Sequence, residues 1–238
     1  MNKKGFVYVA LDHNSQGDNI QFANVLSRGV DSKKYGFKIN LDSLANFSPH
    51  ALNPYFIIRR IKELGRPVFV DMKMWNGGRT MENVAKGCAE LGVDIINMYP
   101  HAGEKFMRKV KKALEGSNTK LFGLTVLTHY TDADTERLYG KNLKDATVML
   151  ARMNYNFGAD GIILPGTQLG NVTGIHLPKM SPGIRPLWYE NKRDNFQEQI
   201  VTPSEAIHRG ARYIVVGSPI AKSEKPEKAL EKILSEVS

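Results

Sequence analysis

The chain has 238 residues, of which 42% are hydrophobic and 24% charged, a composition typical of a globular domain and not of a disordered chain. Its one cysteine, Cys88, excludes a disulfide scaffold and a zinc site made of several thiolates. No apolar run approaches the roughly 18 residues of a membrane span. Residues Met1–Gly5 are too short and polar for a signal peptide, so we expect a cytoplasmic protein without membrane contact.

The charge balance is basic, with 33 Lys and Arg residues against 24 Asp and Glu residues and a formal net charge of +9. Such a balance indicates a nucleic acid, an anionic surface or an anionic small molecule as partner, or else a generally basic surface without one. No helix-turn-helix, zinc-finger or RNA-binding signature is present, so we expect no nucleic-acid partner. The six histidines lack metal-ligand spacing, so we expect no metal site.

Short apolar runs rich in β-branched and aromatic residues recur along the chain and predict strands. Most are continuously apolar, the pattern of strands buried on both faces of a parallel sheet. In chain order, strands are predicted at Phe6–Leu11, Tyr35–Ile39, Val68–Met72, Asp94–Met98, Leu121–Val126, Gly161–Leu164, Gly174–Met180 and Tyr213–Val216.

Segments with apolar residues at three- and four-residue spacing lie between these strands and predict helices. They are Asn19–Arg28, Pro49–Leu64, Met81–Leu91, Glu104–Leu114, Ala146–Phe157 and Pro226–Val237. Alternation of strands and helices predicts a parallel sheet of βα units. About eight such units over residues 1–238 favour a single-domain (β/α)₈ TIM barrel, with a doubly wound open sheet as the alternative. The polar segment 187–199 is long enough to be a mobile lid.

Polar residues recur where the predicted strands end, the place where barrels carry their chemistry. Asp71 and Lys73 are two residues apart, so on a strand their side chains point the same way, and Lys38 lies on a neighbouring strand. Two cations around one carboxylate can bind an anionic substrate and deliver a proton, or can form a buried ion pair that only joins two strands. Further polar residues at predicted strand ends are Asp12, Asn76, His101, Thr125, Thr128 and Ser181.

Two glycine-containing loops follow the last two predicted strands, where barrels often bind phosphate. They are Pro182–Pro186 (PGIRP) and Val215–Pro219 (VVGSP). Their backbone N–H groups can contact a phosphate, or their glycines can simply make tight turns.

Seven blocks of sequence occur in an order and spacing that is specific, although no single block is. They are Ala10–Asp12, Phe37–Ile39, Asp71–Asn76, Val126–Thr128, Ser181–Pro186, Val201–Pro203 and Val215–Ile220. In these blocks the chain resembles the orotidine 5′-phosphate decarboxylase family over nearly its whole length. The resemblance implies a homodimeric barrel with active sites at the dimer interface. It also implies removal, without a cofactor, of the C6 carboxylate of orotidine 5′-monophosphate (OMP) to give uridine 5′-monophosphate (UMP) in pyrimidine biosynthesis.

The resemblance also implies roles for individual residues. Lys73 would protonate C6 as CO₂ leaves, and a fixed ammonium there would stabilise the developing negative charge. Asp71 would face the substrate carboxylate, and Lys38 would orient the cluster and contact the ribose. The other implied contacts are Asp12 with the ribose, Thr80 from the neighbouring subunit, Thr128 beside the segment that reads the pyrimidine edge, Gln197 with the phosphate, and the substrate-binding positions Pro182, Gly217 and Ser218.

Two positions depart from the family pattern. Asn76 replaces the last acid of Asp-x-Lys-x-x-Asp, which reaches across the dimer into the other site. Ser218 replaces the arginine that usually grips the phosphate. Arg79, or a lid cation at Lys192 or Arg193, is expected to supply the missing charge.

These departures leave two alternatives to the decarboxylase. One is a metal-assisted sugar-phosphate lyase of the same superfamily, of the keto-gulonate- or hexulose-phosphate type, whose members typically have glutamate at the position of Lys38. The other is a non-catalytic nucleotide-binding barrel. The retained Lys38, Asp71 and Lys73 favour the decarboxylase.

Overall fold

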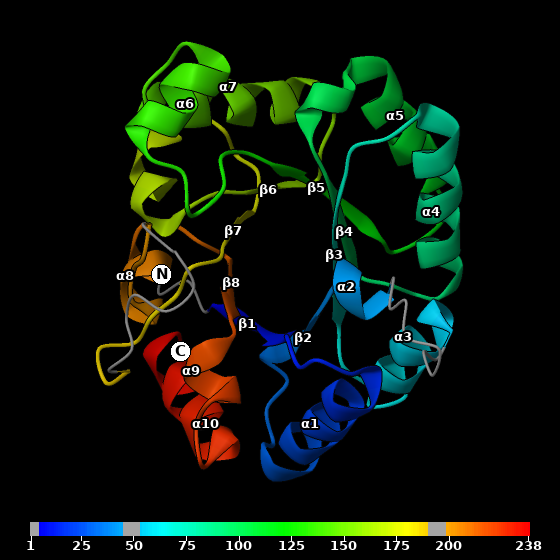
Figure 1. The fold of residues 1–238 in the computed structure, drawn as a ribbon, viewed down its shortest axis with the longest axis vertical. Helices are drawn as coiled ribbons and strands as arrows, with labels where there is room; N and C mark the ends of the chain where they lie inside the picture. The colour runs from blue at the N-terminus through cyan, green and yellow to red at the C-terminus, as the bar shows by residue number, and fades with distance from the viewer. Residues whose placement is uncertain (1–4, 45–52, 190–198) are drawn as a thin grey trace.

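Eight parallel strands close into a barrel around the centre of the molecule (Figure 1). The computed structural model describes residues 5–44, 53–189 and 199–238. Each strand pairs with the next along the chain, and β8 pairs with β1. The strands are β1 (Phe6–Leu11), β2 (Tyr35–Asn40), β3 (Val68–Met74), β4 (Ile95–Met98), β5 (Lys120–Leu124), β6 (Gly161–Ile163), β7 (Lys179–Ser181) and β8 (Tyr213–Val216). The predicted single-domain (β/α)₈ barrel is therefore confirmed, and the open sheet is wrong.

Helices surround the barrel on its outer side (Figure 1). They are α1 (Gln16–Gly29), α2 (Leu41–Leu44), α3 (Pro54–Lys62), α4 (Gly78–Glu90), α5 (Glu104–Ala113), α6 (Asp132–Tyr139), α7 (Leu143–Asn156), α8 (Pro203–His208), α9 (Ser218–Ala221) and α10 (Pro226–Glu236), with 3₁₀ helices η1 (Pro100–Ala102) and η2 (Gly166–Asn171). No helix in the described ranges is both long enough and apolar enough to cross a membrane.

Most predicted helices and strands differ from the structure by one to a few residues at their ends, and two differences are larger. Strand β7 covers only Lys179–Ser181, because Gly174 has a φ of 74° and Pro178 has no N–H to donate to a strand ladder. Apolar spacing does not predict α6, although the side chains of Thr131 and Asp134 form a capping box at its start. The first residues of the predicted helix Pro49–Leu64 lie outside the described ranges.

Alternation along the strands separates two cores and thereby positions the site. On β1, Val7 and Val9 pack in the core between the barrel and the helices, whereas Tyr8 and Ala10 belong to a second core inside the barrel. Ala10 pairs with Lys38 on β2 in the parallel register. The same inward face that is filled by apolar side chains deeper in the barrel therefore carries charged side chains at the carboxyl ends of β1, β2 and β3.

Candidate active site

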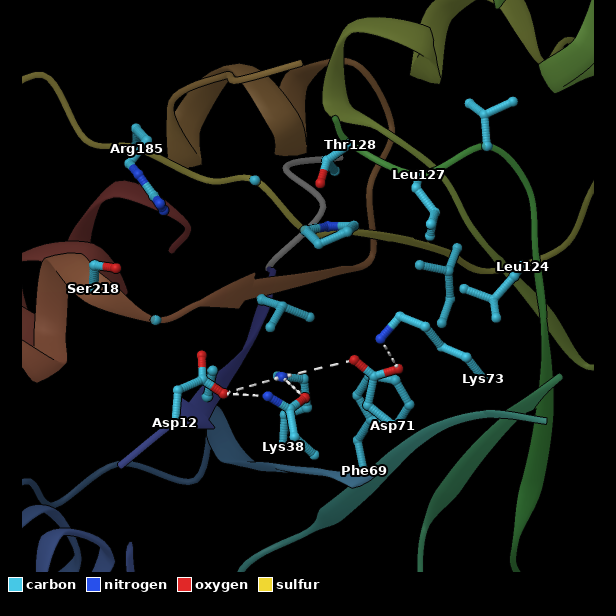
Figure 2. Close-up of a pocket in the computed structure, with 18 residues that line it drawn as sticks. Asp12, Lys38, Phe69, Asp71, Lys73, Leu124, Leu127, Thr128, Arg185 and Ser218 are labelled. Carbon is cyan, nitrogen blue, oxygen red and sulfur yellow. Dashed lines mark hydrogen bonds and ion pairs between the residues drawn. The ribbon is translucent and has the colours of Figure 1, made fainter. Parts of the chain in front are cut away.

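A pocket of about 250 Å³ opens at the carboxyl ends of the strands (Figure 2). Apolar side chains from inside the barrel line its inner part; they are Ala10, Phe69, Leu124, Ile163 and Val215. Polar residues line the rest, together with parts of the loops after β5, β7 and β8. The polar residues are Asp12, Lys38, Asn40, Asp71, Lys73, Thr128, Arg185 and Ser218, and the loops also contribute Pro182 and Gly217. The pocket therefore joins an apolar base to a wall of fixed charges.

Cations and carboxylates alternate along one wall of the pocket (Figure 2). The Nζ atom of Lys38 lies 3.3 Å from Oδ1 of Asp12 and 3.6 Å from Oδ2 of Asp71. The Nζ atom of Lys73 lies 2.8 Å from Oδ1 of Asp71. The side chain of Lys38 is 9% exposed, whereas that of Lys73 is 40% exposed. Lys38 thus joins the strand ends, and Lys73 is the ammonium that a bound molecule can reach.

Asp71 is ionised in this arrangement despite its burial. Burial is the largest influence on its pKa and acts to raise it. The ammonium groups of Lys38 and Lys73, with hydrogen bonds from Lys73 and Asn97, outweigh burial and hold the pKa of Asp71 below its usual range. A carboxylate flanked by two ammonium groups is therefore the resting state of the site at neutral pH.

This ionisation predicts how an Asp71→Asn variant depends on pH. Because the folded-state pKa is depressed, the carboxylate contributes its full stability above the unfolded-state pKa of about 4 and loses it as the pH falls through the lower folded-state value. At pH 7 the substitution should cost about 3 kcal/mol, since it leaves the buried Lys38 with one charged partner fewer. Thermal unfolding of both proteins at neutral pH and at about pH 3 should show this difference shrinking in acid. An equal difference at both pH values would contradict the prediction.

The backbone at Lys73 is not a regular strand. The pairing of β3 with β4 shifts between Val70 and Met74, and Lys73 adopts a φ of 48°, which side chains other than glycine rarely take. The fully buried Asn97 of β4 accepts the N–H of Lys73 at 2.7 Å and donates to Oδ1 of Asp71 at 2.7 Å. The sequence pattern predicts that Lys73 and Asp71 lie together because side chains two residues apart share one face of a strand. In the structure their ion pair instead depends on this irregular backbone.

A third cation lies at the opposite end of the pocket. Arg185 and Ser218 both line it, and Figure 2 shows them together at one end, with Lys73 and Leu127 toward the other. The side chain of Arg185 is buried, its Nη1 donates to the carbonyl of Ile184 at 3.1 Å, and its guanidinium lies 5.7 Å from the centre of the Tyr189 ring. The sequence pattern SPGIRP predicts a phosphate contact through its backbone N–H groups and glycine. It gives no role to its arginine, Arg185, which the structure places in the pocket.

The remaining predicted site residues divide into two groups. Thr128, Pro182 and Gly217 line the pocket, and a Cβ at Gly217 would lie 3.1 Å from Oδ2 of Asp12, so glycine leaves space for that carboxylate. The others are exposed, belong to the start of α4 or the loop before it, and do not line the pocket of their own chain; they are Asn76, Arg79 and Thr80.

The predicted lid, 187–199, lies mostly outside the described residues, as do Gln197, Lys192 and Arg193 within it. Its described ends are fixed: Nε1 of Trp188 donates to Oε1 of Glu236 at 3.1 Å, and the N–H of Gln199 donates to the carbonyl of Thr128 at 3.0 Å. The latter contact joins the end of this segment to the loop that follows β5.

Two other polar residues at strand ends have partners outside the pocket. The hydroxyl of Thr125 is buried and donates to the carbonyl of Ile163 at 2.9 Å. His101 stacks on Tyr139 with ring centres 5.6 Å apart, and its partial burial lowers its pKa. Within residues 5–44, 53–189 and 199–238, no three His, Cys, Asp or Glu side chains are arranged to hold a metal ion.

The fold and the site define a (β/α)₈ barrel whose charged pocket lies at the carboxyl ends of the strands, the usual position of active sites in this class. Within the class the match is specific. The chain belongs to the orotidine 5′-phosphate decarboxylase / HUMPS family, which it matches over residues 5–233.

Individual relatives match over nearly their whole length. An orotidine 5′-phosphate decarboxylase of Nautilia profundicola is 29% identical over 236 residues, covering 96% of this chain and 97% of the relative. One of Vibrio vulnificus is 30% identical over 235 residues, covering 95% of each. The crystal structure of orotidine 5′-phosphate decarboxylase from Lactobacillus acidophilus superposes with a TM-score of 0.78 at 26% identity and covers 99% of both chains.

Proposed function

We propose that this protein decarboxylates OMP to UMP in pyrimidine biosynthesis. The observation that carries the proposal is the pair of Lys73 and Asp71, an accessible ammonium held 2.8 Å from an ionised carboxylate in the pocket of a chain that belongs to this family. The pair supplies a proton donor and a negative charge at adjacent points, as loss of a carboxylate followed by protonation requires.

The order of polar groups along the pocket matches the order of groups along a nucleotide. Arg185 and Ser218 lie at one end, Asp12 and Lys38 follow, and Lys73 lies farthest away (Figure 2). A phosphate bound by Arg185 places the ribose beside Asp12 and Lys38 and brings the pyrimidine to Lys73. A guanidinium suits a phosphate because its planar donors match two phosphate oxygens.

In the proposed reaction, the bond between C6 and the carboxylate carbon breaks and its electron pair stays on C6. The ammonium of Lys73 stabilises that charge and transfers one proton to C6, so that CO₂ and UMP form and the neutral amine regains a proton from water. Asp71 repels the substrate carboxylate in the ground state, and this repulsion disappears as neutral CO₂ forms. Binding of the distant phosphate supplies the free energy that holds the carboxylate against Asp71.

We further propose that a second copy of the chain completes the site. Asn76, Arg79 and Thr80 are exposed next to the mouth of the barrel, where a partner's pocket can receive them. Trp75 beside them is 67% exposed, an unusual state for the largest apolar side chain and one that a subunit interface would remove. Sedimentation analysis should therefore give the mass of a dimer.

An Asn76→Asp variant tests this shared site. If the asparagine has simply removed a charge that acts in the partner's pocket, the variant should raise kcat/KM about tenfold, the effect of a partly screened charge near the reacting group. Asn76 currently accepts the N–H of Gly77 at 2.7 Å, a bond that aspartate can keep, so the loop shape is preserved. Steady-state kinetics measures the change. Unchanged or lower activity would show that the loop works with an amide, and mass spectrometry must verify that Asn76 has not deamidated in the unmodified protein.

One assay separates the proposal from its alternatives. Purified protein is mixed with OMP, and loss of the orotate absorbance is followed with and without a chelator. Turnover that persists in chelator supports the decarboxylase. Turnover of a sugar phosphate that stops in chelator would support the metal-assisted lyase, and tight UMP binding without any turnover would support a nucleotide-binding barrel.

A further inference from the structure

Asn40 is a pocket residue at the carboxyl end of β2 to which the proposed reaction assigns no role. It follows Lys38 by two residues and therefore shares its inward face, and the register of β2 with β3 pairs it with Asp71. We infer that Asn40 is a positioning residue that fixes the Lys38 ammonium and selects which oxygen of Asp12 meets the ribose. The identity of the ligand in this inference rests on the proposed function, whereas the contacts of Asn40 are those of the structure itself.

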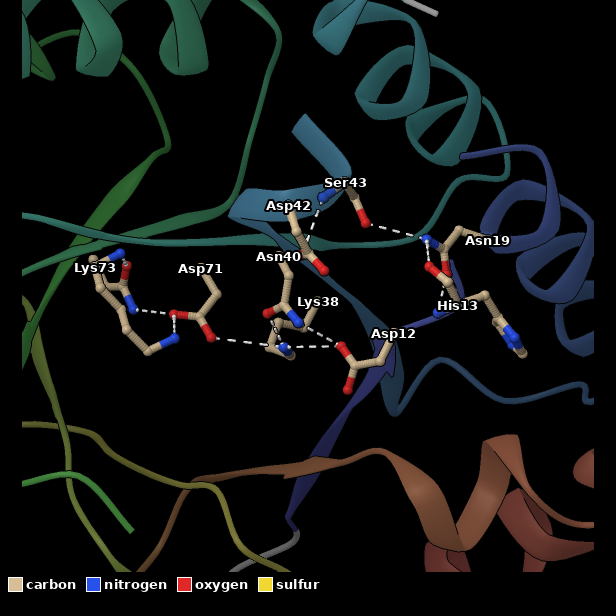
Figure 3. Close-up of polar contacts among 10 residues, drawn as sticks. Asp12, His13, Asn19, Lys38, Asn40, Asp42, Ser43, Asp71 and Lys73 are labelled. Atoms are coloured by element: carbon tan, nitrogen blue, oxygen red, sulfur yellow. Dashed lines mark hydrogen bonds and ion pairs between the residues drawn. The ribbon is translucent and has the colours of Figure 1, made fainter. Parts of the chain in front are cut away.

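The amide of Asn40 uses both of its ends (Figure 3). Its Nδ2 donates to Oδ1 of Asp12 at 2.6 Å, and its Oδ1 accepts a hydrogen bond from Nζ of Lys38. Lys38 thus faces three acceptors, one at the end of each of three adjacent strands: Asp12, Asn40 and Asp71. An ammonium has three N–H donors; hydrogen bonds to Asp12 and Asn40 use two of them, and Asp71 is an ion-pair partner 3.6 Å away. A carboxylate in place of the amide could accept from Lys38 but could not donate to Asp12.

The consequence for Asp12 is an asymmetric carboxylate. Its Oδ1 receives both the Asn40 amide and the Lys38 ammonium. Its Oδ2 accepts no hydrogen bond from the described part of the chain and lies near Gly217, where a Cβ would be 3.1 Å away. Oδ2 is consequently the oxygen that remains for a ligand hydroxyl, and Asn40 helps to hold the carboxylate in that orientation.

The backbone on both sides of this contact is held by hydrogen bonds that are wholly or partly buried (Figure 3). Helix α2 begins directly after Asn40, and its Ser43 accepts hydrogen bonds from Nδ2 of Asn19 at 3.1 Å and, through its carbonyl, from Nε2 of Gln16 at 2.6 Å. Asn19 also exchanges hydrogen bonds with the backbone of His13, next to Asp12, at 3.0 and 3.2 Å. The loops that carry Asp12 and Asn40 are therefore tied to each other, which favours a permanent contact between the two side chains.

The first test compares affinities for UMP, 2′-deoxy-UMP and 3′-deoxy-UMP by calorimetry. The wild-type protein should bind UMP more tightly than it binds one of the two deoxy analogues, namely the one that lacks the hydroxyl that donates a hydrogen bond to Asp12. In Asn40→Ala the affinity for UMP should fall about tenfold while that for this analogue stays within about twofold, because one oriented hydrogen bond is lost. Asn118→Ala, which alters an exposed asparagine between α5 and β5, should change nothing. An equal loss for all three nucleotides, or no loss, would overturn the inference.

A second test needs no ligand. Acetylation of Lys38 by acetic anhydride is measured by peptide mass spectrometry, with the exposed Lys120 as internal reference. Loss of the acceptor in Asn40→Ala should speed Lys38 labelling about tenfold, whereas Asn40→Asp, which keeps an acceptor and adds a negative charge that favours the ammonium, should label no faster than the wild type. An unchanged labelling rate in Asn40→Ala would overturn the inference. If the wild-type protein neither binds UMP nor consumes OMP, the proposed function fails, and the labelling result still decides whether Asn40 fixes Lys38.

Discussion

A Lys73→Ala variant should lose decarboxylation of OMP by a factor of at least about 10⁴ in kcat, since it removes the group that we propose as both the proton donor and the cation beside the developing charge. Binding of UMP should remain, because Lys38, Asp12 and Arg185 are still in place and UMP has no carboxylate or carbanion for Lys73 to meet. Single-turnover kinetics and calorimetry measure the two effects separately.

The loss can be divided further with Lys73→Arg. A guanidinium keeps the positive charge next to Asp71 but does not release a proton at neutral pH, so this variant should recover little of the activity. Lys86→Ala, at an exposed lysine of α4 that forms an ion pair with Glu82, serves as the control for loss of a charge. Activity of Lys73→Ala above one tenth of the wild-type rate would show that another group donates the proton.

An Arg185→Met variant should lower kcat/KM for OMP about 100-fold, the effect of removing a charge-assisted pair of hydrogen bonds to phosphate. Methionine keeps the apolar stem of the buried side chain, so the loop after β7 should retain its packing. Orotidine, which lacks the phosphate, should be turned over at similar slow rates by both proteins. Equal losses for OMP and orotidine would show that Arg185 supports the fold of the loop and does not hold the phosphate.

The neighbouring Ser218 offers a complementary experiment. If phosphate binding requires only a cation at this end of the pocket and not Arg185 in particular, kcat/KM of the double variant Arg185→Met/Ser218→Arg should be at least about tenfold higher than that of Arg185→Met alone. Ser218 lies on the same end of the pocket as Arg185 (Figure 2), so an arginine there reaches the same ligand group. Failure of the double variant, with the single variant impaired, would mean that the site depends on the geometry of Arg185 itself.

The barrel and the charged wall of its pocket can be predicted from sequence because both follow from local patterns. The apolar run Phe6–Leu11 is a strand over the same residues, and Lys38 inside an apolar run is the inward-facing cation that its position indicates. The register of β2 and β3 pairs Lys38 with Phe69, and Asp71 follows Phe69 by two residues, so alternation along β3 places Asp71 on the same face as Lys38.

The other parts of the site depend on long-range geometry. Asn97 clamps Lys73 and Asp71 only because β3 is irregular beside β4, and a polar residue within the run Asp94–Met98 is the only sequence signal for it. Arg185 points to the pocket because of the path of the loop after β7, which no periodic pattern encodes. The partners of Asn40 come from two separate strands, so its role needs their register.

The positive φ of Lys73 has a consequence for stability. A lysine in this conformation costs about 1 to 2 kcal/mol, whereas glycine adopts it freely. Selection for thermal stability alone would therefore favour glycine at position 73. This substitution would relieve the backbone strain but would also remove the ammonium group. Stabilising this barrel without screening for turnover is therefore expected to select variants that lack Lys73, the only non-glycine residue with a positive φ in the described part of the chain, and with it the group that we propose as the proton donor.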